Sequence, residues 1–346
     1  MKNENKKISK LLLKLCLFLL PVVLYFIIFL IFEPYNYFNL RTKNVNTNQP
    51  IYRVRHFTSE PTNAILLGDS RTAHLDTKLI NDITHKDFTN LAFGGAAQKE
   101  ASDLFWYAID ENPSVDTVYL QVSFYTLNIN YQKDRIANIK KTANNPFAYC
   151  LNFNYNLEML SNMLASLKGT PNDFTAVETA LYTKEDYLDE NGEKLSYRRQ
   201  LLEYIKTIYP NLSTFNVSDI PLSQLEKLLT NPTMKNYRKW EINNSELSRL
   251  LEISDYCQKN NINLTFVLPP IDDTIMQLCL VPLGIDKEMQ NVINTLEKSG
   301  ATVLDFEINN RPNFNETQFY DGFHLDTVRG LPPYTQLLFG NNNTVN

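Results

Sequence analysis

Apolar positions along the chain follow two different spacings. Short runs rich in Val, Leu, Ile and Phe, typical of strands buried on both faces, occur at 64–67, 116–123, 263–270 and 301–306. The clearest helical spacing has apolar residues at i, i+3, i+4 and i+7, namely Met289, Val292, Ile293 and Leu296. We expect Asp286 to cap this helix and Gly300 to follow its end. Alternating helices and strands predict an α/β domain with a mainly parallel sheet, whose site lies at the carboxyl ends of the strands.

A longer apolar stretch lies near the N-terminus. Residues 11–32 are apolar except for Lys14, which is enough to cross a bilayer core as a transmembrane anchor. No small-residue cleavage pattern follows, so we expect the anchor to be retained. Lysines are frequent in residues 1–10, and the positive-inside rule therefore predicts a cytoplasmic N-terminus. The rest of the chain is then periplasmic or extracellular, attached to the cytoplasmic membrane by a single span.

The remaining chain divides by composition. We interpret 33–61 as a polar linker, 62–340 as the globular domain and 341–346 as a polar tail. Within the domain, 130–244 interrupts the alternation and is interpreted as a large helical insertion. It contains one amphipathic helix, with a face formed by Leu157, Leu160, Met163, Leu164 and Leu167. Its aromatic residues fit either a cap over the cleft or an extra packing layer.

Composition excludes several classes of function. The 346 residues are 43% hydrophobic and 21% charged, with a net charge of −5, so the chain is globular and no nucleic-acid binding is expected. The four cysteines show no CxxC or metal-like spacing, which leaves room for at most one disulfide and predicts no metal site. Phosphate-binding and dinucleotide-binding glycine motifs are absent, and no cofactor is expected.

The first apolar run ends on a serine, in the sequence ILLGDSRTAH at 65–74. One interpretation is that the turn presents the Ser70 hydroxyl over a cleft, beside the free amides of a helix N-terminus. The alternative is ordinary turn chemistry, in which Asp69 or Ser70 caps the following helix. Arg71 is a candidate either for binding an anionic group of the substrate or for a salt bridge.

A base for this serine is found near the C-terminus. The sequence FYDGFHLD places Asp321 three residues before His324, after the last expected strand. The carboxylate can then orient the imidazole while the imidazole takes the proton of Ser70, as in serine hydrolases. We therefore expect His324 within hydrogen-bond distance of both Ser70 and Asp321. His74 is a second, weaker candidate, because only Asp76 is nearby to orient it.

These segments resemble the SGNH hydrolase (GDSL-like) superfamily. The family is marked by short sequence blocks. Gly68-Asp69-Ser70 resembles its first block, Asn90, Ala92 and Gly95 resemble its second, and Asp321 and His324 match its last, in the family's order. The resemblance implies a three-layer α/β/α fold with Ser70 as nucleophile, His324 as base and Asp321 as its partner.

The third block departs from the family. Where the family has Gly-x-Asn, with an asparagine that helps to hold the oxyanion, this chain has QVSFYTLN. Ser123, Tyr125 and Asn128 are the candidates for that donor. An oxyanion hole made only from the amides of Ser70 and Gly95 lacks one donor, which typically costs about 3 to 4 kcal/mol of barrier. This departure favours a specialised transferase over vigorous hydrolysis.

The architecture is similar to that of membrane-anchored SGNH-like proteins that modify the cell envelope together with membrane-bound O-acyltransferases. The leading hypothesis is a serine O-acyltransferase or esterase acting on an O-acyl group, most simply acetyl, of a cell-envelope glycan. Two alternatives remain open: a plain esterase using water, and a non-catalytic scaffold for a membrane-bound O-acyltransferase.

Overall fold

Five parallel strands form one sheet in the computed structural model, which describes residues 2–41, 47–170, 240–320 and 322–340. The strands are β1 (Ala64–Leu67), β2 (Phe88–Asn90), β3 (Thr117–Gln121), β4 (Asn263–Leu268) and β5 (Thr302–Asp305). Their order across the sheet is β2-β1-β3-β4-β5. The four expected strands are confirmed, whereas the short edge strand β2 was not predicted. The chain is therefore an α/β protein with an all-parallel sheet.

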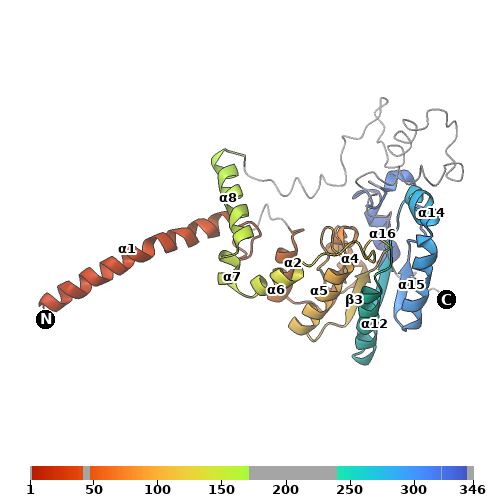
Figure 1. The fold of residues 1–346 in the computed structure, drawn as a ribbon, viewed down its shortest axis with the longest axis horizontal. Helices are drawn as coiled ribbons and strands as arrows, with labels where there is room; N and C mark the ends of the chain where they lie inside the picture. The colour runs from red at the N-terminus through yellow and green to blue at the C-terminus, as the bar shows by residue number, and fades with distance from the viewer. Residues whose placement is uncertain (1, 42–46, 171–239, 321, 341–346) are drawn as a thin grey trace.

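Helices connect and surround the strands (Figure 1). The N-terminal set is α1 (Lys2–Phe32), α2 (Pro50–Ser59), α3 (Ser70–Ala73), α4 (Thr77–Thr84), α5 (Gln98–Glu111), α6 (Ile136–Ala143), α7 (Pro146–Cys150) and α8 (Phe153–Leu167). The C-terminal set is α12 (Asn244–Lys259), α13 (Asp273–Ile275), the π-helix η3 (Met276–Leu280), α14 (Val281–Leu283), α15 (Ile285–Lys298), the 3-10 helix η4 (Glu316–Gln318) and α16 (Leu331–Phe339).

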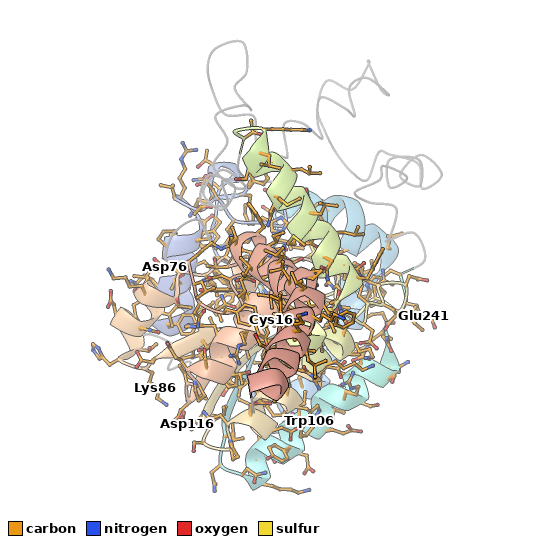
Figure 2. All side chains as sticks on the ribbon, turned by 90° about the vertical axis from the view of Figure 1, so that its left-hand side faces the viewer. Cys16, Asp76, Lys86, Trp106, Asp116 and Glu241 are labelled. Carbon is orange, nitrogen blue, oxygen red and sulfur yellow. The ribbon has the colours of Figure 1, made fainter. Side chains whose placement is uncertain are left out.

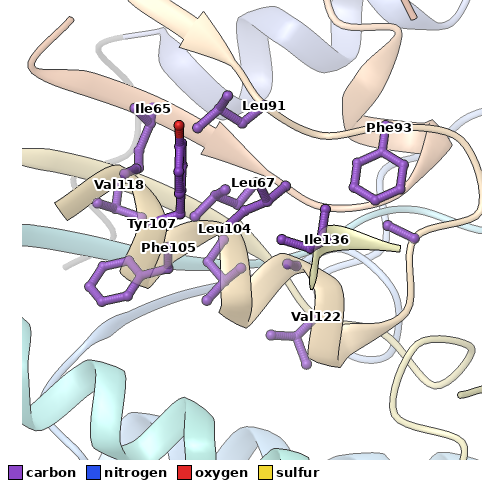
Figure 3. Close-up of a cluster of buried hydrophobic side chains, with 14 of the residues drawn as sticks. Ile65, Leu67, Leu91, Phe93, Leu104, Phe105, Tyr107, Val118, Val122 and Ile136 are labelled. Carbon is purple, nitrogen blue, oxygen red and sulfur yellow. The ribbon is translucent and has the colours of Figure 1, made fainter. Parts of the chain in front are cut away.

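Apolar side chains on the two faces of the sheet belong to two separate clusters. On β1, Ile65 and Leu67 belong to the larger cluster, with residues of α5, α12 and α15. Part of this cluster, including Phe105 and Val118, is shown in Figure 3. Ala64 and Leu66 belong to the other cluster, with residues of α4 and α16. Since successive side chains of a strand point to opposite faces, helices cover both faces of the sheet.

The N-terminal helix α1 extends away from the domain (Figure 1). Its segment Ile8–Phe32 is long and apolar enough to cross a membrane, and only 6% of its most hydrophobic window is buried inside the protein. The expected span of 11–32 lies within this segment.

The polar segment 33–61 differs from the expected linker. It contains α2, whose Ile51, Val54 and Phe57 are buried in the larger cluster. Before it, Glu33 accepts hydrogen bonds from the Tyr37 N–H at 3.0 Å and from the Tyr149 hydroxyl at 2.7 Å. The described parts of this segment, 33–41 and 47–61, therefore pack as part of the domain, because apolar residues three apart in α2 lie between its charged ones.

Two helix expectations have different outcomes. The helix expected over 286–300 is confirmed as α15, but its N-cap is Gly284, so Asp286 lies inside the first turn and caps nothing.

In the insertion, α8 confirms the amphipathic helix. The described helices α6, α7 and α8 pack against α2, α1 and each other, and α6 also contacts α5. Residues 171–239 of the insertion lie outside the described residues, as does the tail 341–346.

Candidate active site

Ser70 lies directly beyond the carboxyl end of β1, at the start of the one-turn helix α3. Asp69 is the N-cap, and its Oδ1 accepts the Arg71 N–H at 2.9 Å. The turn needs Gly68, because a Cβ there would lie 2.6 Å from Cβ of Gln121 on the neighbouring strand β3. Because β1 has β2 on one side and β3 on the other, Ser70 lies where the strand order reverses, the usual ligand position in such sheets.

His324 meets Ser70 at this edge of the sheet. Its Nε2 lies 2.7 Å from the Ser70 Oγ, although the two residues are 254 apart in sequence. When the ring proton is on Nδ1, Nε2 accepts the serine hydroxyl proton, as a general base must. This part of the expected triad is in place. Asp321 lies outside the described residues.

The loop bearing His324 is held by backbone hydrogen bonds. The Tyr320 N–H donates to the His324 carbonyl at 2.8 Å, and Phe319 forms an antiparallel bridge with Leu325. The Asp272 N–H, just beyond β4, donates to the Gly322 carbonyl at 2.8 Å. These contacts tie the loop to the carboxyl end of the sheet and so fix the position of the imidazole.

A buried ionic network lies behind Ser70. Arg71 has a side chain only 5% exposed, and its Nη2 lies 2.9 Å from the Asp69 Oδ2. The same nitrogen donates to the Ser123 Oγ at 2.6 Å, and Nη1 lies 3.5 Å from the Glu307 Oε1. Glu307, beyond β5, also accepts the Phe124 N–H at 3.1 Å. Arg71 thus pairs with Asp69 and, through its contacts with Ser123 and Glu307, joins the ends of β1, β3 and β5.

The two carboxylates of this network have opposite pKa shifts. Burial raises the pKa of Glu307 to about 8, although Arg71 and the Phe124 N–H act in the other direction. Burial also acts to raise the pKa of Asp69, but the charge and hydrogen bonds of Arg71 outweigh it and hold that pKa below its usual value. The network therefore holds the Arg71–Asp69 ion pair, while burial favours the neutral form of Glu307 over its charged form.

Gln121 is a site residue that the sequence analysis did not identify. Its Oε1 accepts the Asp69 N–H at 3.2 Å and the Thr72 hydroxyl at 2.6 Å, so it holds both sides of the serine turn. Its buried Nε2 has no hydrogen-bond partner among the described residues. Glu307 was also missed. The only sign of Gln121 and Glu307 in the sequence was their position at the ends of β3 and β5. Polar residues are common after strands, and the sequence does not show which strand ends lie side by side.

Gly95 has a positive φ of 62° and a strongly hydrogen-bonded carbonyl. That oxygen accepts from the Tyr131 hydroxyl at 2.7 Å, Lys133 Nζ at 3.0 Å and Arg135 Nη2 at 2.9 Å. In the described part of the chain, neither the Ser70 N–H nor the Gly95 N–H donates a hydrogen bond within the protein. Both amides therefore keep their hydrogen-bonding capacity for another acceptor.

Three other expected site residues have structural partners. Asn90 donates to the Thr72 carbonyl at 2.8 Å and accepts the Ala92 N–H at 3.1 Å, so it fastens β2 to α3. Ser123 is fully buried, and its Oγ accepts from the Arg71 Nη2 at 2.6 Å, so it belongs to the ionic network behind Ser70. Asn128 is also buried, where its Oδ1 accepts the Asn130 N–H at 3.0 Å.

Tyr125 is half-buried and lies beside Tyr131, whose hydroxyl donates to the Gly95 carbonyl. Its ring centroid lies 4.3 Å from that of Tyr131, and the two hydroxyls are hydrogen-bonded. Burial raises the pKa of Tyr125, so its phenol stays protonated and is able to donate a hydrogen bond. Tyr125 is therefore the third-block candidate that stays partly exposed, with its hydroxyl hydrogen-bonded to that of Tyr131.

A cavity of about 490 Å³ opens beside α3, lined by Arg53, His56, His74, Asn90 and Thr327 among others. Burial lowers the pKa of His74 to about 4, and the charges of His324 and Arg53 act in the same direction. His74 is therefore neutral at physiological pH and lines this cavity, while the imidazole in contact with Ser70 is that of His324.

The described residues contain no group of three His, Cys, Asp or Glu side chains arranged to hold a metal ion. Cys16, Cys150 and Cys257 are free thiols. The arrangement that does carry chemistry is a serine hydroxyl held against an imidazole, which suits nucleophilic attack on an acyl carbonyl. No protein-family model matches this chain, and no curated protein matches it either.

Proposed function

We propose that this chain is a membrane-anchored serine O-acyltransferase or esterase with a three-layer SGNH-like fold. Its substrate is an O-acyl group, most simply acetyl, on a cell-envelope polysaccharide. The observation on which the proposal rests is the 2.7 Å contact between the Ser70 Oγ and the His324 Nε2 at the carboxyl edge of the sheet.

The reaction follows from this geometry in two half-reactions. His324 takes the proton of Ser70 as Oγ attacks the acyl carbonyl, and the amides of Ser70 and Gly95 stabilise the oxyanion. The ester C–O bond then breaks, His324 returns the proton to the leaving alcohol, and an acyl-serine remains. A glycan hydroxyl, or water in an esterase, attacks the acyl-serine with His324 again as base; the acyl–Oγ bond then breaks, and His324 returns the proton to Ser70. Asp321 is assigned the role of orienting His324.

The apolar helix α1 supports a site outside the cytoplasmic membrane. Lysines precede the span, which by the positive-inside rule keeps the N-terminus in the cytoplasm. The domain then faces the periplasm or the cell exterior, where glycans are modified. A membrane-bound O-acyltransferase is the partner that would deliver the acyl group across the bilayer.

A serine-reactive fluorophosphonate tests the nucleophile directly. The full-length chain in detergent micelles is expected to be labelled, and Ser70→Ala is expected to abolish labelling. Ser114→Ala, the same change at an exposed turn, is the matched control and is expected to label like the wild type. Equal labelling of Ser70→Ala and the wild type, or no labelling of the wild type, would refute the nucleophile.

The acceptor distinguishes transfer from hydrolysis. The full-length chain is incubated with an acetylated glycan, with and without an acceptor glycan. Acceptor-dependent consumption of the donor supports the transferase, whereas rapid acetate release without acceptor supports the esterase.

A non-catalytic scaffold is a second candidate, favoured by the third block, which lacks the family's Gly-x-Asn and in which Ser123 and Asn128 are buried. In cells, a scaffold keeps full polymer acylation after Ser70→Ala, whereas an enzyme loses it.

A further inference from the structure

The helices α7 and α8 expose apolar side chains although they belong to the globular part of the chain. On α8 these are Phe153, Leu157, Leu160, Leu164 and Leu167, which we call the apolar stripe; each is between 42% and 74% exposed. They are spaced by four, three, four and three residues, so they lie on one face of the helix. Phe147 and Leu151, around α7, are exposed to a similar extent.

The opposite face of α8 attaches the helix to the protein. Tyr155 and Met159 are buried, and the Asn162 side chain donates to the Phe32 carbonyl at 3.3 Å. Tyr35 packs edge-on against Tyr155, with ring centroids 5.3 Å apart, and its hydroxyl donates to Glu158. These partners lie at or beyond the end of the apolar segment of α1, so this face of α8 points toward the domain.

Contacts with α1 itself lie inside its apolar segment. The Tyr25 hydroxyl donates to the Asn156 Oδ1 at 2.8 Å, and Phe26 packs edge-on against Phe147 with centroids 6.3 Å apart. Tyr25 precedes Phe32 by seven residues, roughly 10 Å along the helix axis at 1.5 Å per residue. The α7–α8 pair therefore contacts the part of α1 that would lie in the outer half of a bilayer.

The two helices also cross. In Figure 1 α8 runs transverse to α1, and Figure 2, which faces the N-terminal end of α1, shows α8 crossing it again. A helix transverse to a membrane span lies in the plane of the membrane. Because the domain-facing residues occupy one side of α8, the apolar stripe on the other side faces the bilayer.

We propose that α7 and α8 form a lipid-binding platform that sinks the apolar stripe into the outer leaflet beside α1. The proposal rests on the membrane anchoring included in the proposed function. Its occupant is the acyl chains of the bilayer, because the exposed Phe147 of the same helix pair packs against Phe26 within the apolar segment of α1. In-plane helices of this kind bury their apolar face about 5–10 Å deep, similar to the depth of the contacts with α1. With two attachments the domain has a fixed tilt and height above the membrane.

Tryptophan quenching by brominated lipid tests the platform. Full-length Leu160→Trp is placed in nanodiscs of phosphatidylglycerol and phosphatidylethanolamine, one chain per disc, and its emission is compared with that of the wild type in the same lipid. We expect brominated acyl chains to remove most of the added emission. Asn291→Trp, exposed on α15, is the matched control and is expected to be quenched only by aqueous acrylamide.

Phe18→Trp on α1 separates this proposal from the anchoring on which it rests. Quenching of Phe18→Trp without quenching of Leu160→Trp overturns the platform and leaves the anchor intact. Absence of quenching at both positions overturns the anchor, and with it the platform. Shielding of Leu160→Trp from both lipid and acrylamide also overturns the platform, because protein then covers the stripe. Fluorophosphonate labelling of Ser70 reports on the proposed reaction independently of each result.

Discussion

Replacing Arg71 with methionine removes the one cation of the network behind Ser70 while keeping a side chain of similar length. In the folded protein, Arg71 lies between Asp69, with a side chain 2% exposed, and Glu307, which is fully buried. The substitution leaves Asp69 without its counter-charge and Ser123 without the donor at 2.6 Å. We expect the variant to be strongly destabilised and its serine turn to be less well held.

The magnitude follows from burial. Removing one partner of a buried ion pair typically costs about 3–5 kcal/mol, because an uncompensated charge stays buried or must take up a proton. Arg71 holds the pKa of Asp69 low, so the stability that Asp69 contributes is present above its unfolded pKa and is lost as pH falls. Without Arg71, burial acts unopposed by that charge and raises the pKa of Asp69 above its unfolded value, so the folded variant loses stability as pH rises above about 4. The loss of stability in Arg71→Met is therefore expected to be larger at pH 8 than at pH 5.

Urea unfolding of the full-length chain in mild detergent, followed by tryptophan fluorescence at both pH values, measures this difference. Arg311→Met is the matched control, because Arg311 pairs with a largely exposed Asp273 and such surface pairs contribute about 1 kcal/mol or less. A loss below about 1 kcal/mol for Arg71→Met, or an equal loss at both pH values, would contradict the argument.

Three other predictions concern the same region. Replacing His324 with glutamine is expected to slow fluorophosphonate labelling of Ser70 by about 10²–10⁴-fold, the usual contribution of a general base, and an unchanged rate argues against that role. The pKa of His74 is lowered to about 4 in the folded protein, so between about pH 6.5 and 4 the unfolded chain binds a proton that the folded chain does not. The free energy of unfolding therefore falls as pH decreases through this window, and His74→Gln is expected to reduce that pH dependence in urea unfolding. Gly68→Ala places a Cβ 2.6 Å from the Cβ of Gln121, so it is expected to cost about 1–3 kcal/mol of stability and to slow labelling of Ser70. Wild-type stability together with a wild-type labelling rate would show that the turn relaxes to admit the methyl group.

The core of the fold could be predicted because strands buried on both faces are continuous apolar runs. All four of the runs identified in the sequence are strands; the first matches β1 at both ends, and the ends of the others differ by at most two residues. The edge strand β2 has three residues and ends in Asn90, too short for any periodicity to be visible. Helix α2 was missed because Ile51, Val54 and Phe57 alternate with Arg53 and Arg55, so that the segment has the composition of a linker.

The candidate site could be predicted only in part. Ser70 and His324 were identified as a pair by residue type and by order along the chain, and their side chains are in contact. Ser123 was assigned from its position after a strand, but position along the sequence does not show whether a hydroxyl faces the cleft or a buried arginine. The partners of Arg71 come from the ends of β3 and β5, so predicting them requires the strand order β2-β1-β3-β4-β5. That order depends on how helices pack on the two faces of the sheet.

The strand order also explains how a distant loop can supply the base. β5 is separated from β1 by β3 and β4, so a loop that follows β5 must cross two strand ends to reach Ser70. The hydrogen bond from the Asp272 N–H to the Gly322 carbonyl holds the loop at the end of β4, partway along this route. Gly322 has a φ of 86°, which residues with a side chain rarely adopt, so the chain can turn there just before His324. The pairing of Ser70 with His324 thus depends on backbone contacts at β4, which contributes no side chain to that pair.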